Sequence, residues 1–552
     1  MRKELKEKIV NLVSKDFKEV LDLKEKIKVD LPKEEKHGDI STNIAFLLSK
    51  PLKKKPIEVA NKIKEILEKD KDFEKVEVAG AGFINIFLSK DFYFEFLKKA
   101  VQENDEYGKE KEKTKGNINI EFVSANPTGP LHLGHGRGAV VGSTLSNLKD
   151  YAGYVVEREF YINDAGRQIY LLGKSVYARF RQIEEPDYPF PEDGYKGEYI
   201  KDIAKELYQY EREKIYSMLD EDEAIEFCAE YAKNYLLDEI KKDLKEFGVE
   251  FDIWFSEKSL YEHGKVDEAI EFLKKKGLVY EKEGALWLKT TVYGDDKDRV
   301  LIRSDGTYTY FAADIAYHYD KYKRGYDYII NVWGADHHGY FPRLKAAVMA
   351  FGVPEEWIRV IFIQMVKLFR NGKEVKMSKR SGEFITLREL INEVGKDAVR
   401  YMFLTKDSNT HLNFDIDLAL KQSNENPVYY VQYAHARIMS VFKEAKQRFG
   451  FDVEEDFKAD VSLLKEDIER QIMKEIAFLP DLIKETAEKE QPHKLTSITH
   501  NLASKFHNYY YHYKFLVEDE NLMRARLFLL KAIRSALRTL FKLMGITPVE
   551  RM

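Results

Sequence analysis

The segment from Asn117 to Ala152 constrains the fold more than any other part of this 552-residue chain. Residues 117–124 alternate in polarity and predict a strand, and the spacing of apolar residues over 136–152 predicts a helix. The turn between them, residues 126–138, contains two prolines and four glycines. Because a strand, a tight turn and a helix open a nucleotide-binding βαβ unit, we expect a parallel sheet.

Four further segments predict strands, at residues 155–159, 300–303, 328–333 and 359–366. Helical stretches lie between them, and a Pro-rich stretch with a long charged run indicates an insertion around residues 185–290. The predicted fold class is therefore α/β. A Rossmann-type parallel-sheet catalytic core spans residues 111–425, a small α+β domain (residues 1–110) precedes it, and an all-α domain (residues 426–552) follows it.

Composition narrows the class of protein only moderately. The chain has 90 Lys and Arg residues against 95 Asp and Glu residues, so its net charge of -5 says little about partners. The single cysteine, Cys228, excludes an internal disulfide framework and a multi-cysteine zinc site, so we expect no protein-bound zinc. The first residues lack the apolar core of a signal peptide, and no apolar run reaches the roughly 20 residues needed to span a bilayer. We expect a cytoplasmic protein without a membrane partner.

The glycine-rich turn contains a pair of histidines, His132 and His135, three positions apart. Helix N-termini favour anions, and two imidazoles can donate hydrogen bonds to a phosphate as charge develops on it. Gly134 lets an adenine or a ribose approach the backbone, and Pro127 and Gly129 fix the turn. The sequence therefore predicts ATP binding by these five residues, with both histidines catalytic.

A second polar loop, Gly372 to Gly382, is dense in lysine. A basic loop on its own is usually solvated surface. This loop, however, follows the histidine turn along the chain, which is the order that a βαβ nucleotide-binding site requires. Its ammonium groups can neutralise a polyphosphate in the transition state. We predict that Lys376 and Lys379 are catalytic and that Met377, Ser378 and Lys379 bind ATP.

The two segments together resemble the "HIGH" and "KMSKS" signatures of class I aminoacyl-tRNA synthetases, here residues 132–135 and 376–380, with Lys-Arg after the serine where the class has Lys-Ser. Residues 121–132 and 161–168 resemble the arginyl-tRNA synthetase family in particular. The resemblance runs essentially end to end. It implies ATP with Mg²⁺, L-arginine and tRNA(Arg) as partners, an additional N-terminal tRNA-binding domain and a helical C-terminal anticodon-binding domain.

The substrate arginine requires a carboxylate partner for its guanidinium group. On a helix, Tyr310 and Asp314 lie on one face, so Asp314 can take the guanidinium while the phenol stacks or donates a hydrogen bond. The resemblance places the arginine-recognising Tyr and Asp of the family at these two positions. It places further arginine contacts at Glu121, Ser124, Asn126 and His132.

A glycine-bounded turn, residues 334–339, contains Asp336, His337 and His338. A metal site is the less favoured interpretation, because such a turn after a strand lies at the carboxyl edge of a parallel sheet, where ligands bind. We predict that Asp336 and His338 contact arginine, although the sequence does not show which side chain of the three faces the pocket. Gln364 is a weaker candidate of the same kind.

Contacts with tRNA are predicted mainly in the appended domains. The last helix repeats basic residues at three- and four-residue steps, which form a stripe that either follows phosphates or is a solvated face; these are Lys531, Arg534, Arg538 and Lys542. Two aromatic runs, residues 429–433 and 508–513, either stack on unpaired anticodon bases or belong to the core.

The resemblance implies the activity of an arginine–tRNA ligase. It would convert arginine and ATP to arginyl-adenylate, transfer the arginyl group to the terminal ribose of tRNA, release AMP and pyrophosphate, and act as a monomer. The rival interpretations are a class I synthetase for glutamate or cysteine, a catalytically silent RNA-binding paralogue and a cytidylyltransferase-like enzyme. A cysteine enzyme typically needs zinc, and a cytidylyltransferase would lack the long helical domain.

Overall fold

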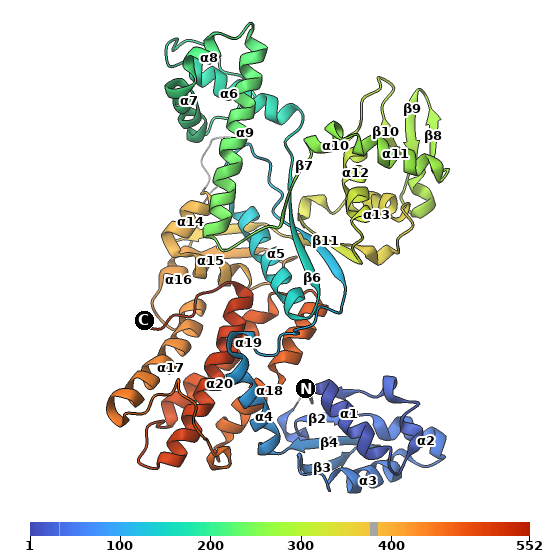
Figure 1. The fold of residues 1–552 in the computed structure, drawn as a ribbon, viewed down its shortest axis with the longest axis vertical. Coiled ribbons are helices and arrows are strands. Elements are labelled where there is room, and N and C mark those ends of the chain that lie inside the picture. Colours follow the sequence, from blue (N-terminus) through green and yellow to red (C-terminus); the bar gives the residue numbers. More distant parts are fainter. Residues whose placement is uncertain (33, 376–384) are drawn as a thin grey trace.

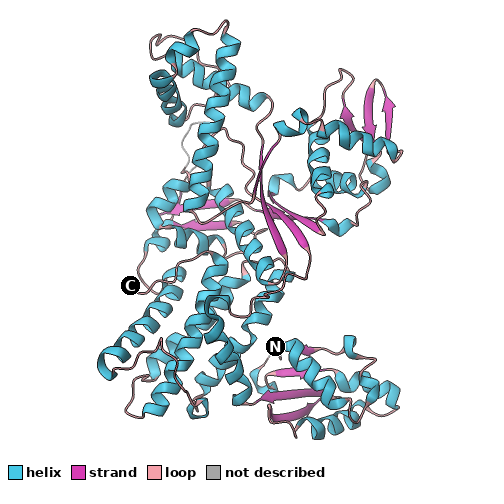
Figure 2. Ribbon diagram, viewed as in Figure 1, coloured by secondary structure: helices cyan, strands magenta, loops and turns pink. Residues whose placement is uncertain are grey.

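The computed structural model describes residues 1–32, 34–375 and 385–552. An N-terminal domain and a bundle of C-terminal helices lie at one end of the molecule, and two lobes extend from a central sheet at the other end (Figure 1). Strands gather in the N-terminal domain, in the centre and at the edge of one lobe (Figure 2). The predicted fold class is confirmed.

The first domain is a small α+β unit. Its antiparallel sheet has the order β1-β2-β4-β3 and packs against three helices. The elements are α1 (Arg2–Val13), β1 (Val29–Asp30), β2 (Ile40–Thr42), α2 (Ile44–Leu52), α3 (Pro56–Leu67), β3 (Phe73–Ala79) and β4 (Phe83–Leu88). The next helix, α4 (Lys90–Glu103), packs on α18 (Asp467–Glu488) and α20 (Glu520–Met544) of the C-terminal bundle, although the expected first domain of residues 1–110 includes it.

The central sheet is parallel throughout, with the order β12-β11-β5-β6-β7. Its strands are β5 (Asn117–Glu121), β6 (Val155–Ile162), β7 (Ile253–Ser256), β11 (Tyr328–Gly334) and β12 (Ile358–Ile363), and α5 (Leu133–Tyr151) connects β5 to β6. The chain leaves β5 toward β6 and later returns to the other side of β5 as β11. The strand order therefore reverses beside β5, which is where such sheets bind ligands.

Two sequence predictions about this sheet are wrong. Residues 300–303 correspond to β10 (Arg299–Ile302), which pairs antiparallel with β9 in a separate sheet of order β10-β9-β8. The single insertion expected around residues 185–290 is divided by β7, which pairs with β6 in the central sheet. A four-residue strand between long helical runs carries too little pattern to reveal its sheet.

The two insertions form the two lobes in Figure 1, each with its own apolar core. The first contains α6 (Arg167–Arg181), α7 (Glu198–Tyr210), α8 (Arg212–Tyr216) and α9 (Glu221–Glu246). The second contains α10 (Lys258–Glu262), α11 (Lys265–Lys275), β8 (Val279–Lys282), β9 (Ala285–Leu288), β10 and α12 (Tyr310–Lys323), and α13 (Phe341–Met349) packs on α12.

A short connecting region follows the central sheet and leads to the C-terminal bundle. It contains β13 (Val366–Arg370), β14 (Lys373–Glu374), α14 (Leu387–Val394), α15 (Lys396–Phe403), β15 (Leu412–Asp415) and α16 (Ile416–Leu420). From Asn426 onward the chain is helical, as predicted, with α17 (Pro427–Phe449), α18 (Asp467–Glu488), α19 (Lys494–His512) and α20 (Glu520–Met544). Among the described residues, no helix is long and apolar enough to cross a membrane.

Helix α5 packs closely on the end of β5, and two of its glycines allow a matched test of that packing. A Cβ atom on Gly142 would overlap the ring of the buried Phe122. Within the described residues, nothing lies within 4 Å of a Cβ atom on Gly138. We expect Gly142→Ala to lower the free energy of unfolding by about 1–3 kcal/mol through overpacking, despite the higher helix propensity of alanine.

Gly138→Ala is the control, and its free energy of unfolding should stay the same or rise by up to about 1 kcal/mol. Thermal unfolding of both variants measures the difference. Equal unfolding midpoints for the two variants would contradict the packing described for Gly142.

Candidate active site

The backbone reverses abruptly at the end of β5. Val123 and Ser124 have positive φ angles of 69° and 42°, which L residues rarely adopt, and a β-branched residue there is strained. This conformation turns the Ser124 hydroxyl back to donate to Oε1 of Glu121 at 3.0 Å, while it accepts the Tyr161 amide at 3.1 Å. This strained conformation, together with the two hydrogen bonds, places Ser124 at the carboxyl edge of the central sheet, between β5 and β6.

The two histidines close the first turn of α5 on each other. Nδ1 of His132 accepts from the amides of Gly134 and His135, at 3.1 and 3.4 Å, and Nδ1 of His135 accepts from the His132 amide at 3.3 Å. The rings stack with centroids 3.6 Å apart. Because Nδ1 accepts a backbone hydrogen bond in each ring, the ring proton is on Nε2. Each ring can therefore donate a hydrogen bond from Nε2.

The segment that follows the lysine loop meets this turn. His132 forms an antiparallel bridge with Thr386, and the Leu387 amide donates to the Leu131 carbonyl at 2.8 Å. Thr386 also caps α14 reciprocally with Glu389. The turn of the first signature is thus joined through backbone hydrogen bonds to the residues that follow the second signature. The predicted residues of the loop, Lys376, Met377, Ser378 and Lys379, lie outside the described residues.

The first insertion packs on the glycine-rich turn. The Tyr199 hydroxyl on α7 donates to the Thr128 carbonyl at 2.8 Å and lies 3.0 Å from where a Cβ atom on Gly129 would be. Asn126 donates to Gln168 of α6 at 2.7 Å. The lobe formed by α6–α9 therefore helps to hold the turn that contains the predicted ATP contacts.

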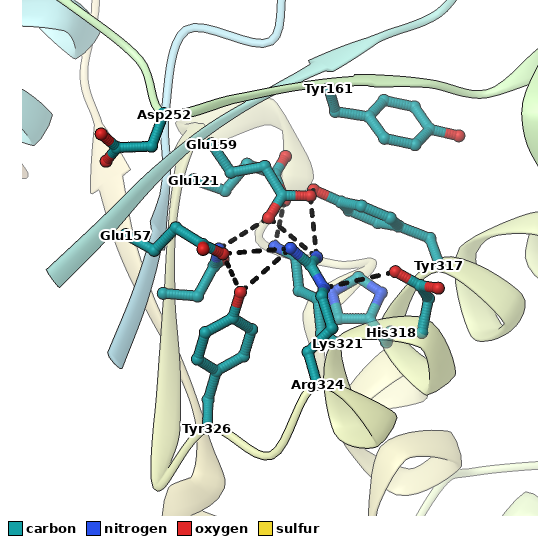
Figure 3. A network of polar contacts seen from close by, with 12 residues as sticks. Glu121, Glu157, Glu159, Tyr161, Asp252, Tyr317, His318, Lys321, Arg324 and Tyr326 are labelled. Carbon is teal, nitrogen blue, oxygen red and sulfur yellow. Dashed lines mark hydrogen bonds and ion pairs between the residues drawn. The ribbon is translucent and has the colours of Figure 1, made fainter. Parts of the chain in front are cut away.

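Two cations, Lys321 on α12 and Arg324 directly after it, face acids of the central sheet (Figure 3). Lys321 is fully buried and donates to Oε2 of Glu121 at 2.8 Å. Arg324 donates to both carboxylate oxygens of the buried Glu159, at 3.0 and 2.8 Å, and the Tyr317 hydroxyl donates to the same group at 2.9 Å. These pairs compensate the acids on β5 and β6 and fix α12 against the sheet.

His318 extends this network to Asp314. Burial lowers the pKa of His318 to about 3, so its ring is neutral. Nδ1 donates to the Asp314 carbonyl, with the atoms 2.7 Å apart, and Nε2 accepts from the Asn331 amide group at 3.0 Å. Oδ1 of Asn331 in turn accepts from Lys321 at 3.4 Å. His318 therefore links the backbone carbonyl of Asp314 to Asn331 on β11.

Asp314 is the candidate acceptor for the substrate side chain. Burial raises its pKa to about 7, the hydrogen bond that Oδ2 accepts from Tyr340 opposes this rise, and the charges of Glu257 and Glu121 add to it. Tyr310, one turn earlier on α12, is 69% exposed. The structure thus keeps Tyr310 and Asp314 on one helix but places only Asp314 in a desolvated setting.

Glu257 is a residue that sequence reasoning missed. It follows β7 directly, is only 4% exposed and is fixed by its amide, which donates to the Ile162 carbonyl at 3.0 Å. Burial raises its pKa, and nearby Asp164 adds to the effect. An acid directly after a strand of the sheet is the signal that could have found it, had β7 been recognised.

The turn after β11 is exposed. The Asp336 side chain is 81% exposed and lies 3.3 Å from Nδ1 of His337, and the His338 ring stacks on Phe362 with centroids 3.6 Å apart. None of these three polar residues is buried. In the described part of the chain, no group of three His, Cys, Asp or Glu side chains could hold a metal ion.

Three family models match the chain. Residues 1–88 match the arginyl tRNA synthetase N terminal domain, residues 97–460 match the tRNA synthetases class I (R) catalytic domain, and residues 431–552 match the DALR anticodon binding domain. An arginine–tRNA ligase of Aquifex aeolicus is 48% identical over 99% of this chain and 100% of its own length. One from Geobacillus thermodenitrificans is 46% identical over 100% of this chain and 99% of its own length. The chain belongs to the arginyl-tRNA synthetase family.

Solved structures agree with this membership. A Campylobacter jejuni structure assigned to the arginyl-tRNA synthetases has a TM-score of 0.77 at 40% identity, covering 84% of this chain and 100% of its own. The Thermus thermophilus arginyl-tRNA synthetase has a TM-score of 0.74 and covers both chains fully, but at 22% identity it shows the fold alone. The resemblance predicted from the signatures is confirmed.

Arg137 is a second residue that the sequence did not single out. It lies two positions after His135 on α5, is fully buried, and donates to the carbonyls of Gln364, Asp407 and Thr410 at 2.8–2.9 Å. Burial lowers its pKa to about 10, so it stays cationic near neutral pH. The weaker candidate Gln364 therefore contributes its backbone to this clamp, which joins the synthetase signature helix to the end of β12.

The basic residues of α20 do not form the exposed stripe that was expected. Lys531 and Arg534 are only 8% and 5% exposed. Arg534 forms an ion pair with Glu454, and Lys531 donates to the Glu454 and Glu455 carbonyls at 3.4 and 3.5 Å. The helix is central in the bundle, so these polar side chains are buried with partners.

The other two cations of α20 also have protein partners. Arg538 donates to Nε2 of His435 at 3.0 Å, and the half-exposed Lys542 pairs with Asp105 and Glu106 at 3.1 and 3.2 Å. Contact of the four cations with tRNA stays a prediction.

The structure brings the two aromatic runs of the anticodon domain together on α17 and α19. The guanidinium of Arg437 lies 4.2 Å from the Tyr433 ring centroid and 4.7 Å from that of Tyr510. Arg437 also donates to Nδ1 of His507 at 3.1 Å. Tyr510 is exposed and Tyr433 is partly exposed. Stacking of tRNA bases on this face remains a prediction, but the required side chains share one surface.

The buried pair of Lys321 and Glu121 provides a test of the network. Lys321→Met leaves Glu121 buried without its cation, and we expect the free energy of unfolding to fall by about 3–5 kcal/mol. Lys323→Met is the control, because Lys323 is on the same helix and pairs with the exposed Glu268, so a change of only about 0–1 kcal/mol is expected. Denaturant unfolding of both variants measures this, and equal midpoints would contradict the network.

Proposed function

We propose that this chain attaches arginine to tRNA(Arg) in two steps. ATP activates the arginine carboxylate, giving arginyl-adenylate and pyrophosphate, and the arginyl group then passes to the 3′-terminal ribose of the tRNA with release of AMP. The family membership and the bridge between His132 and Thr386 support this reaction. We expect the chain to act as a monomer in the cytoplasm, with Mg²⁺ entering as part of the nucleotide substrate.

The nucleotide would lie over the first turn of α5. The Nε2 protons of His132 and His135 suit phosphate and ribose oxygens, and Gly134 and Gly129 allow close approach of the nucleotide. Pro127 fixes the turn before them. Lys376 and Lys379 would neutralise the departing pyrophosphate, with Met377 and Ser378 also contacting ATP. The backbone bridge from His132 to Thr386 supports this proposal, because it brings the segment that follows the lysine loop to the turn.

The arginine side chain would be held by Asp314, with Glu257 close by and Tyr310 at the entrance. The ammonium and carboxylate groups of the substrate would reach the residues at the β5 edge, Glu121, Ser124, Asn126 and His132. Asp336 and His338 would have to turn from their exposed positions to make contact, so we place them at the rim of the site.

One observation carries the choice of arginine. Asp314 lies in a desolvated setting where its strongest charged neighbours are two other acids, Glu257 and Glu121, and this raises its pKa. Glu121 has a cation of its own in Lys321, whereas the partner of Asp314 on Oδ2 is a neutral donor, Tyr340. A guanidinium group supplies the missing positive charge and a planar pair of donors. A glutamate substrate would instead add a further carboxylate.

Asp314→Asn tests this assignment. The amide has the size of the carboxylate but no charge, so we expect the KM for arginine to rise by roughly 10²-fold, the loss of about 3 kcal/mol typical of a buried charge-assisted pair. The KM for ATP should change little. Steady-state aminoacylation with each substrate varied in turn gives both constants.

Asp296→Asn is the matched control, since Asp296 is an exposed acid of the same lobe and pairs with Arg299. An unchanged KM for arginine in Asp314→Asn, equal to that of the control, would overturn the assignment.

A further inference from the structure

Tyr340 donates the hydrogen bond that Asp314 accepts. It directly precedes α13, and its hydroxyl contacts Oδ2 of Asp314 across the interface of α12 and α13. Burial raises the pKa of Tyr340 far above its usual value, so the phenol stays protonated and acts as the donor. One carboxylate oxygen of Asp314 is therefore taken by the protein itself.

The ring of Tyr340 is held on several sides. Phe311 meets it edge-on with ring centroids 6.4 Å apart, Trp333 lies 6.2 Å away, and the guanidinium of Arg343 lies 5.3 Å from its centroid. Its amide donates to the His337 carbonyl at 2.9 Å. Since both ring and backbone are fixed, the hydroxyl has a defined position, as a group that orients another side chain requires.

Asp314 faces titratable groups from several elements, among them Tyr161 on β6 and Tyr261 on α10. Glu121 comes from β5, Glu257 follows β7, and both disfavour a second negative charge. His318 on α12 is neutral, and Tyr340 beside α13 is a neutral donor. Among these groups, only the Tyr340 hydroxyl acts on the Asp314 carboxylate to favour its ionised form.

We propose that Tyr340 is a positioning residue for arginine, fixing Oδ2 of Asp314 so that the carboxylate is anionic and presents Oδ1 to the guanidinium group. This inference rests on the proposed role of Asp314 as the side-chain acceptor. It adds a residue that governs both the orientation and the charge state of that acceptor. Arginine binding should then depend on pH through Asp314 and on Tyr340 through the same carboxylate.

Tyr340→Phe tests the proposal, because phenylalanine keeps the ring and its packing but removes the donor. Without the hydrogen bond the pKa of Asp314 rises further, so less of it is ionised at a given pH. We expect the KM for arginine to rise up to about threefold at pH 8.5 and roughly tenfold at pH 6.5, since one pKa unit is a factor of ten below the pKa. The kcat and the KM for ATP should stay at their wild-type values at both pH values.

Tyr280→Phe is the control. It removes a similar hydroxyl–carboxylate bond, to Asp298 at 3.0 Å, from the hairpin of the same lobe and should leave the KM for arginine unchanged. A Tyr340→Phe effect that is the same at both pH values, or no effect beyond the control, overturns the proposal.

Asp314→Asn, measured in parallel, separates the two claims. If Asp314→Asn raises the KM for arginine and Tyr340→Phe does not, the role of Tyr340 is wrong and the role of Asp314 stands. If Asp314→Asn leaves the KM for arginine unchanged, the assignment of the acceptor itself is wrong.

Discussion

The hydrogen bond from the Leu387 amide to the Leu131 carbonyl, with the adjacent bridge from His132 to Thr386, holds the catalytic half of this molecule together. These short backbone contacts join the start of α5 to the start of α14, so the residues that follow the second signature meet the first signature, although most of the catalytic domain separates them in sequence. Arg137 reinforces the junction from the next part of α5 by clamping three carbonyls near β12 and β15. The phosphate chemistry proposed for the histidines relies on this junction, because the residues that follow the lysine loop lie beside it.

The charged residues on and directly after α12 have two different roles. Some pair with acids of the protein, and one, Asp314, is the proposed acceptor for the substrate. On the side that faces the sheet, Lys321 and Arg324 pair with Glu121 and Glu159, and a buried pair of this kind is costly to break on one side only. Nearer the pocket, Asp314 has a neutral phenol as its partner, and further acids lie around it. The protein therefore compensates Glu121 and Glu159 with its own cations, whereas among the described residues Asp314 forms no ion pair, which suits a cationic ligand.

Sequence alone predicted the parts of this structure that local pattern determines. The strand, turn and helix from Asn117 to Ala152 and the helical C-terminal domain follow from spacing and turn residues, and the structure contains all of them. The predictions that failed concern which strands, distant in sequence, pair with one another. Residues 299–302 have a strand pattern, but the pattern does not say which sheet they join, and the four residues of β7 are too few to stand out, so Glu257 was missed with them. The basic stripe of α20 was misjudged because burial depends on the helices around it, and Lys531 and Arg534 are enclosed with their own acceptors.

We propose that this protein activates arginine, and no other amino acid, for transfer to tRNA. A charging assay of the full chain on total tRNA with ATP and Mg²⁺ tests this directly when each standard amino acid is supplied separately in labelled form. We predict acid-precipitable label with arginine alone, together with formation of AMP. Charging with another amino acid but not with arginine would contradict the role proposed for the Asp314 pocket, and RNA binding without charging of any amino acid would contradict the enzymatic function itself.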